Sequence, residues 1–172
     1  MVGIYGMGGV GKTTLAKEVG KEVKQSNIFN TVVLATVSQT PNFKTIQGQI
    51  ADSLSLRLEE ESEDGRAKRL SIRLKNENKV LIILDDIWAK LDLTKMGILL
   101  DDGDQKSCKI LLTTRREQVC NVMRCGSKIS LNVLKEEEGL ALLKRNAGIG
   151  DHDLPTLNAL QKKVLENVRV CL

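Results

Sequence analysis

Short apolar runs alternate along this chain with stretches in which apolar residues recur every three or four positions. Runs at residues 2–5, 31–37, 80–84 and 109–112 are rich in β-branched and aliphatic residues, which predicts β-strands. The run at 80–84 is entirely aliphatic, as in strands that are buried on both faces of a parallel sheet. A shorter run at 129–131 predicts a fifth strand. Strands that alternate with helical segments predict an α/β fold.

The intervals between these strands have helical periodicity. Helices are predicted from residue 12, from residue 43 and from Ser62, which is followed by two acidic residues that suit a first helical turn. The residues expected on the core face of the first helix are Leu15, Ala16, Val19 and Val23. Two more helices are predicted at residues 135–147 and from about Pro155 onward. We therefore expect one domain at residues 1–148 and the start of a truncated helical subdomain at residues 149–172.

The composition of the chain argues against several classes of function. The net charge of +4 is spread along the chain and only 2% of the residues are aromatic, which argues against a nucleic-acid partner. The longest strongly apolar run, at residues 80–84, is far shorter than a membrane span. No secretory signal opens the sequence, so a cytoplasmic location is expected. The four cysteines lack C-x-x-C spacing and there is one histidine, so no zinc site is predicted.

A phosphate-binding motif follows the first predicted strand and opens the first predicted helix. Its G-x-x-x-x-G-K-[ST] pattern is Gly6-Met7-Gly8-Gly9-Val10-Gly11-Lys12-Thr13. Its glycines (Gly6, Gly8, Gly9 and Gly11) permit backbone conformations that residues with a Cβ avoid, and they bring N–H groups close to phosphate oxygens. Lys12 is expected to contact the β- and γ-phosphates, and the Thr13 hydroxyl to bind Mg²⁺. Thr14 is a further candidate, for the α-phosphate.

Polar residues follow two other predicted strands. Asp85 and Asp86 come directly after the run at 80–84, at the edge where open α/β sheets bind ligands. We expect Asp85 to hold Mg²⁺ and Asp86 to polarise an attacking water. Arg115 ends the strand that starts at residue 109 and would contact the γ-phosphate, with Arg116 as the alternative. Lys12, Asp86 and Arg115 are thus the candidate catalytic residues.

Together these motifs resemble the nucleotide-binding domain of plant intracellular disease-resistance proteins, the NB-ARC class. The matching segments are the phosphate loop through Thr14-Leu15, Val37-Ser38-Gln39, Leu84-Asp85-Asp86-Ile87-Trp88, Thr113-Thr114-Arg115 and residues 140–148. With Trp88 after Leu84-Asp85-Asp86-Ile87, this segment resembles the coiled-coil branch of the family. The downstream G-L-P-L-A and M-H-D motifs of the family are absent, as is the upstream segment that helps to hold adenine.

The resemblance implies a three-layer P-loop NTPase fold with a five-stranded parallel sheet, in which the strand ending at Arg115 lies beside the phosphate-loop strand. It also implies a molecular switch that binds ADP or ATP with Mg²⁺ and is at most a slow ATPase. Its partners would be coiled-coil, ARC and leucine-rich-repeat domains of a parent receptor. Alternative interpretations are a small-molecule kinase or another P-loop ATPase, and a truncated fragment without function.

Overall fold

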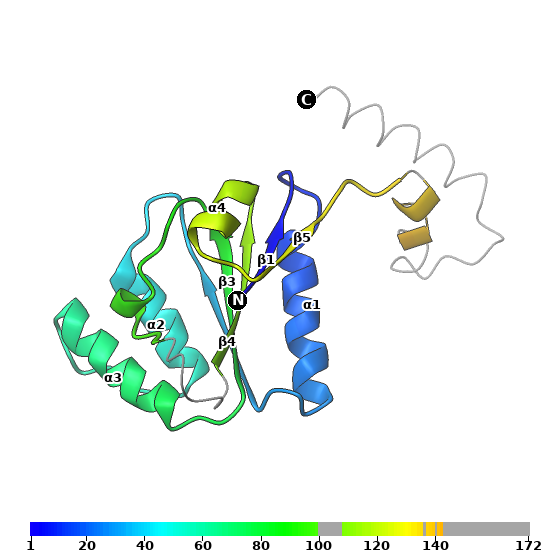
Figure 1. The fold of residues 1–172 in the computed structure, drawn as a ribbon. Coiled ribbons are helices and arrows are strands. Elements are labelled where there is room, and N and C mark those ends of the chain that lie inside the picture. Colours follow the sequence, from blue (N-terminus) through cyan, green and yellow to red (C-terminus); the bar gives the residue numbers. More distant parts are fainter. Residues whose placement is uncertain (100–107, 136, 140, 143–172) are drawn as a thin grey trace, which may run out of the picture. The chain divides into compact units, whose positions relative to one another are not determined.

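Five parallel strands form one sheet in the order β2-β3-β4-β1-β5 (Figure 1). The computed structural model describes residues 1–99, 108–135, 137–139 and 141–142. The strands are β1 (Val2–Tyr5), β2 (Thr31–Thr36), β3 (Val80–Ile87), β4 (Cys108–Thr114) and β5 (Ser127–Ser130). The predicted α/β fold with a five-stranded parallel sheet is therefore confirmed, and β4 pairs with β1 as expected.

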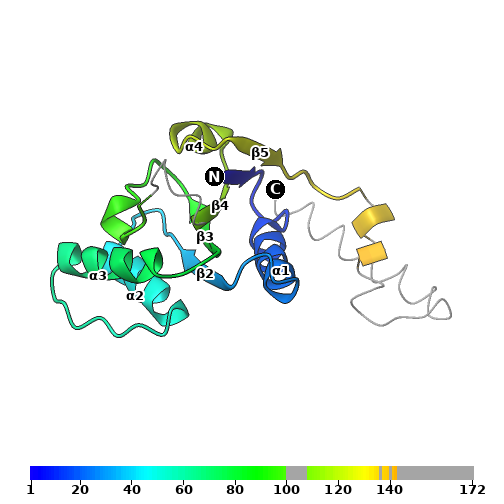
Figure 2. The same cartoon turned by 60° about the horizontal axis from the view of Figure 1, so that its bottom comes forward.

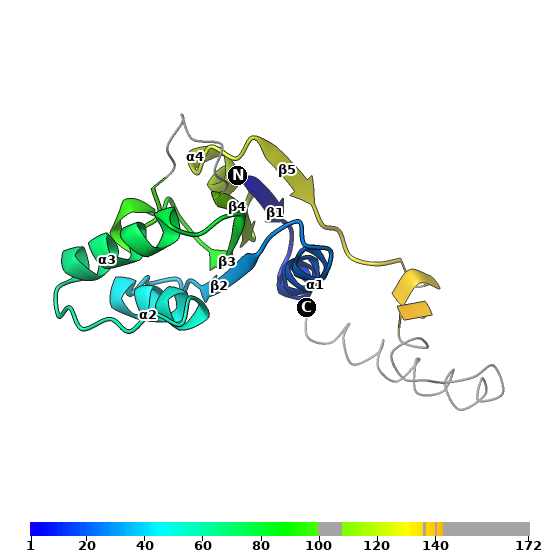
Figure 3. The same cartoon turned by 90° about the horizontal axis from the view of Figure 1, so that it is seen from below.

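Helices cover both faces of the sheet and complete three layers. On one face α1 (Lys12–Gln25) packs against β2, β3 and β4. On the other face lie α2 (Phe43–Ser53), α3 (Glu63–Lys75), the 3₁₀ turn η1 (Thr94–Met96) and α4 (Glu117–Val122). Seen from two further directions, the sheet remains between α1 and the pair α2 and α3 (Figures 2 and 3).

The aliphatic run of β3 supplies both cores because successive side chains of a strand point to opposite faces. Ile82 and Leu84 are fully buried in the core beneath α2 and α3. Leu81 and Ile83 are buried in the smaller core beneath α1. This is why an uninterrupted apolar sequence, without alternation, predicted a central strand.

A buried glutamine joins the elements on the larger core face. The Gln47 side chain of α2 is fully buried, and its amide donates to the carbonyls of Glu63 and Lys95 at 2.9 and 2.8 Å. Its amide oxygen accepts a 3.1 Å hydrogen bond from Arg66 Nε. Gln47 therefore connects α2, α3 and η1 through a polar group whose hydrogen-bonding capacity is satisfied, which removes the cost of burying it.

The carboxyl ends of the central strands meet at one edge of the sheet. Parallel pairing places Tyr5 of β1 opposite Thr114 of β4, and Thr36 of β2 opposite Asp85 of β3. The β3–β4 register shifts between Leu84 and Ile87, and Asp86 within this irregularity has a left-handed φ of 59°. The bulge redirects the chain at the residue where the candidate site begins, a placement that β-bulges often have.

Several sequence predictions differ in detail from the structure. Leu15 is 38% exposed, so it is not on the core face of α1. Gly20 is on that face instead, and because it has no side chain, α1 can approach the sheet closely. The fifth strand lies at Ser127–Ser130, not at 129–131, and its residues are exposed because it is the edge of the sheet. The helix α4 was not predicted, since six residues are too few to show helical periodicity.

The chain divides into two units, Met1–Asn132 and Val133–Leu172. In the second unit, residues 137–139 and 141–142 are helical, as predicted for residues 135–147. The predicted domain boundary near Gly148 and the helix from Pro155 lie outside the described residues. Within the described part of the chain, no helix is long and apolar enough to cross a membrane.

Two helical glycines provide a matched test of packing against the sheet. We expect Gly48→Ala to raise the free energy of unfolding by about 0.5–1 kcal/mol, because alanine favours the helix and the nearest atom would lie 3.9 Å from the new Cβ. Gly20→Ala gains the same propensity, but its Cβ would lie 2.8 Å from Ile83 Cδ1 and 3.2 Å from Val32 Cγ1. Urea denaturation of both variants should therefore rank Gly48→Ala as the more stable. Equal gains would contradict the close packing of α1.

Candidate functional site

The phosphate loop connects β1 to α1 and has the backbone that its glycines permit. Gly9 and Gly11 have φ of 80° and 94°, and Gly11 is the residue that precedes the first helical residue, Lys12. At Gly6, a Cβ would overlap the carbonyl oxygen of Leu131. Gly8 lacks a left-handed φ, so the conformational freedom that all four glycines permit is not used at this one. A Cβ at Gly8 would instead lie 3.6 Å from Arg115 Nη1.

Lys12 is buried and its ammonium group lies within the curve of the loop. Its Nζ donates to the carbonyl oxygens of Gly6 and Met7 at 2.9 and 2.6 Å. Burial lowers the pKa of Lys12 below 10.5, and the nearby Arg115 guanidinium lowers it further, against the opposing effect of Asp86 and Asp85. The ammonium group is thus held in the loop at the N-terminal end of α1. Free backbone N–H groups at a helix N-terminus attract anions, so this end of α1 is suited to bind one.

Asp85 is buried at the end of β3 and is held by two hydroxyl groups. Thr13 Oγ1 of α1 lies 2.9 Å from each of its carboxylate oxygens. Thr113 Oγ1 of β4 donates to Asp85 Oδ1 at 2.6 Å and accepts from the Asp86 N–H at 2.9 Å. Hydroxyl and carboxylate oxygens are the donors that Mg²⁺ prefers. Thr13 and Asp85 therefore fit a magnesium ion by the chemistry and closeness of their oxygens.

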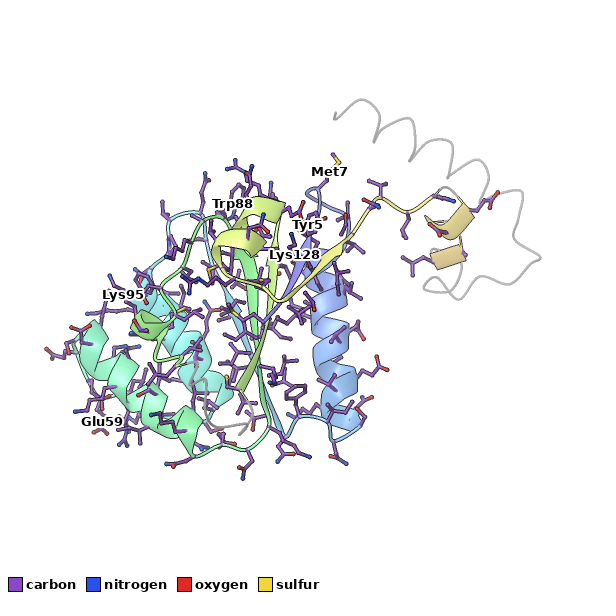
Figure 4. All side chains as sticks on the ribbon, in the orientation of Figure 1. Tyr5, Met7, Glu59, Trp88, Lys95 and Lys128 are labelled. Carbon is purple, nitrogen blue, oxygen red and sulfur yellow. The ribbon has the colours of Figure 1, made fainter. Side chains whose placement is uncertain are left out.

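Asp86, Trp88 and Arg115 form a second cluster beside the first. Trp88 Nε1 donates to Asp86 Oδ2 at 3.0 Å, and Arg115 Nε lies 3.8 Å from Asp86 Oδ1. The Arg115 guanidinium carbon lies 4.5 Å from the centre of a Trp88 ring, a cation–π contact. Figure 4 places Trp88 and Met7 toward the same end of the sheet, the end at which the strands finish. All three side chains of the cluster are partly open to solvent.

An open pocket of about 380 Å³ unites most of the predicted residues. Nine of them line it: Gly8, Gly9, Gly11, Lys12, Thr13, Thr14, Asp85, Asp86 and Arg115. The other predicted loop residues, Gly6, Met7 and Val10, do not contribute to its wall. Arg116 also lies outside the wall and precedes α4, where its N–H donates to Thr114 Oγ1. Of the two candidate arginines, Arg115 is therefore the one that faces the pocket.

The sequence of this chain matches a known protein family. The NB-ARC domain matches residues 1–153, most of the chain. This chain belongs to the NB-ARC family. The resemblance that the sequence motifs indicated is thereby confirmed.

Relatives of this NB-ARC chain include disease resistance proteins of a plant. Disease resistance protein At4g27190 of Arabidopsis thaliana is 36% identical over 151 residues, which are 86% of this chain and 15% of that protein. Disease resistance protein RPS5 of the same plant is 32% identical over 176 residues, or 98% of this chain and 19% of that protein. The NB-ARC chain thus spans less than a fifth of the length of these relatives.

Solved structures place the NB-ARC chain among P-loop NTPases. The Aeropyrum pernix ORC2 protein, solved as ADPNP and ADP complexes, matches with a TM-score of 0.63 and 26% identity. The match covers 86% of this chain and 45% of that one. Cdc6p from Pyrobaculum aerophilum has the same fold, with a TM-score of 0.61 and 17% identity over 83% of this chain and 41% of its own. The predicted P-loop NTPase fold is confirmed.

Sequence reasoning missed two residues of the pocket in this NB-ARC domain. Thr36 at the end of β2 and Thr113 near the end of β4 both line it. Thr113 is the first polar residue after three buried aliphatics, the same pattern that revealed Asp85, so this signal was available in the sequence. Thr36 gave no comparable signal, because its place beside Asp85 depends on the pairing of β2 with β3.

Proposed function

We propose that this chain binds an adenine nucleotide in the pocket above the phosphate loop and serves as the switch module of a plant immune receptor. The observation that carries the proposal is the convergence of Lys12, Asp85 and Arg115 from three separate elements on one pocket. The nucleotide named in the ORC2 structure and the disease-resistance relatives support it. In this proposal the chain is part of a longer cytoplasmic protein of the coiled-coil branch, and its nucleotide-binding domain extends to about Gly148.

The phosphates would lie on the loop between Gly8 and Lys12. Lys12 Nζ, now bonded to the carbonyls of Gly6 and Met7, would turn its hydrogen bonds to the β- and γ-phosphate oxygens. Thr14 would contact the α-phosphate, and Arg115 the γ-phosphate. Thr13 and Asp85 would hold Mg²⁺, which supplies charge neutralisation at the β- and γ-phosphates when bound.

We infer that this site hydrolyses ATP slowly. Asp86 is the residue placed to polarise an attacking water, but both of its oxygens face other groups, Trp88 Nε1 and Arg115 Nε. A water must compete with these contacts for the carboxylate. A protein that retains its nucleotide for long periods is suited to act as a switch. Steady-state turnover above about 10 per second, an ordinary enzymatic rate, would contradict this proposal and favour a kinase or metabolic ATPase.

Calorimetric titration tests the binding proposal. The chain is titrated with ADP, ATP and GDP, with Mg²⁺ and then with EDTA in its place. We expect saturable binding of ADP and ATP, weaker binding of GDP, and loss of ATP affinity without the metal. A folded chain that binds no nucleotide, or that binds GDP as well as ADP, would contradict the proposed function.

The charge state of Lys12 makes a pH dependence part of this proposal. Burial and Arg115 lower the pKa of Lys12, so its ammonium group loses its proton at a lower pH than an ordinary lysine does. A phosphate anion binds the charged form, and the affinity for ADP should therefore fall as the pH rises, beginning at a lower pH than an ordinary lysine would give. Titrations over an alkaline pH series measure this fall. In Lys12→Arg, whose side chain stays charged, the affinity should change little over the same series.

A further inference from the structure

The contacts of Arg115 divide its guanidinium group between three neighbours. Its Nε faces the Asp86 carboxylate at 3.8 Å, and its guanidinium carbon lies over the Trp88 ring, 4.5 Å from the ring centre. Its Nη1 lies toward the phosphate loop, 3.6 Å from where a Cβ on Gly8 would be. Asp86 and Trp88 therefore restrain the guanidinium group, while its Nη1 lies toward the phosphate loop.

Trp88 contacts both members of this ion pair. The indole N–H donates to Asp86 Oδ2 at 3.0 Å while the ring supports Arg115. The Arg115 side chain is 50% exposed, and an ion pair that exposed would by itself restrain a long side chain weakly. The bulge at Asp86, with its left-handed φ of 59°, turns the strand so that Asp86 and Trp88 come together across one intervening residue.

We propose that Trp88 is a positioning residue that preorganises Arg115 for the γ-phosphate and so gives the site its preference for a nucleoside triphosphate over a diphosphate. This inference rests on the proposed function, because it assigns to Trp88 an influence on which nucleotide the same site prefers. Trp88 itself does not line the pocket. It fixes the arginine before the nucleotide arrives, so less side-chain freedom is lost when Arg115 meets the γ-phosphate.

If Trp88 acts through Arg115, its loss should affect ATP and ADP differently, and replacing Arg115 should differ from replacing Arg116. Arg115 would reach the γ-phosphate, which ADP lacks, so weakening its support should reduce triphosphate affinity and leave ADP affinity unchanged. Arg116 provides the matched control, since it is the adjacent exposed arginine and lies outside the pocket wall. Trp88 is the only tryptophan of the chain, so its emission reports on the cluster directly.

The experiment measures dissociation constants for ADP and for a non-hydrolysable ATP analogue with the full chain and four variants. We expect Trp88→Leu to weaken binding of the analogue roughly twofold to thirtyfold, the range of a lost cation–π contact, with ADP binding unchanged. Trp88→Phe keeps a ring but loses the N–H group, and should fall between the parent and Trp88→Leu. Arg115→Ala should lose the preference for the analogue, and Arg116→Ala should keep it.

Tryptophan emission gives a second measurement that does not depend on the stability of the Trp88 variants. Binding of the analogue should change the emission of the parent more than ADP does, because a γ-phosphate on Arg115 changes the charge next to the Trp88 ring while the guanidinium stays over that ring. Arg115→Ala should remove this difference. If the parent binds both nucleotides but Trp88→Leu and Trp88→Phe keep its preference, the role of Trp88 is refuted while the proposed function stands. If the folded parent binds neither nucleotide, both proposals are refuted.

Discussion

Lys12→Ala is expected to weaken ADP binding by roughly 1.5 to 3 kcal/mol, which is about a tenfold to hundredfold loss in affinity. The Lys12 ammonium is buried and already has two carbonyl partners, so it is fixed beside the loop before any phosphate binds. A charge-assisted hydrogen bond from a fixed donor costs little side-chain entropy. Isothermal calorimetry on the parent and the variant measures the difference.

Lys17→Ala is the matched control for this prediction. Lys17 is an exposed lysine of the same helix, about one and a half turns further along α1. Its replacement removes the same charge and the same side chain from α1, and we expect it to leave ADP affinity unchanged. Equal affinities of Lys12→Ala and the parent, with both proteins folded by thermal unfolding, would contradict the assignment of Lys12 to the phosphate site.

Thr113→Val is expected to lower the free energy of unfolding by about 2 to 4 kcal/mol in buffer without nucleotide. The substitution keeps the shape of a buried side chain but removes its hydroxyl, which donates to Asp85 at 2.6 Å and accepts from the Asp86 N–H at 2.9 Å. Loss of a hydrogen bond to a carboxylate costs about 1.5–3 kcal/mol, and loss of a neutral one about 0.5–1.5 kcal/mol. Urea denaturation monitored by circular dichroism measures the change.

Thr113→Ser separates the hydroxyl from the rest of the side chain. Serine retains both hydrogen bonds and loses one methyl group, so we expect a smaller loss of stability than in the valine variant. A valine variant as stable as the serine variant would show that Thr113 contributes packing and not its hydroxyl. Since Thr113 connects β4 to β3 beside the proposed metal ligand Asp85, the valine variant should also bind ATP and Mg²⁺ more weakly.

The sequence predicted the central part of the fold because its strands are buried on both faces. Residues 80–84 and 110–112 could be assigned from composition, since they are uninterrupted aliphatic runs followed by polar residues, as in strands buried on both faces. The edge strand at Ser127–Ser130 was predicted two residues late at its start and one residue late at its end, because an exposed strand has no buried face to define its limits. Leu15 was placed in the core because periodicity records spacing and cannot identify Gly20 as the contact residue.

The candidate site was predictable where residue type and position specify the chemistry together. The glycines and Lys12 of the loop and the acids after β3 fall into this class, and the structure brings most of them to one pocket. Their individual roles stay predictions. The interaction of Trp88 with Asp86 and Arg115 was not predictable, because it depends on the left-handed backbone at Asp86 and on the pairing of β3 with β4. Such contacts arise from tertiary structure, which local sequence patterns do not encode.

The close approach of Gly6 to Leu131 ties the first residue of the phosphate loop to the polypeptide that leaves the sheet. The Leu131 N–H donates to the Tyr5 carbonyl at 2.7 Å, and its own carbonyl occupies the space that a side chain on residue 6 would need. A rotation of the peptide plane between Tyr5 and Gly6 turns the Tyr5 carbonyl, and it must therefore shift Leu131 or break the hydrogen bond from Leu131 to Tyr5. The position of Leu131 directly after β5 therefore depends on the backbone conformation of Tyr5 and Gly6, where the phosphate loop begins.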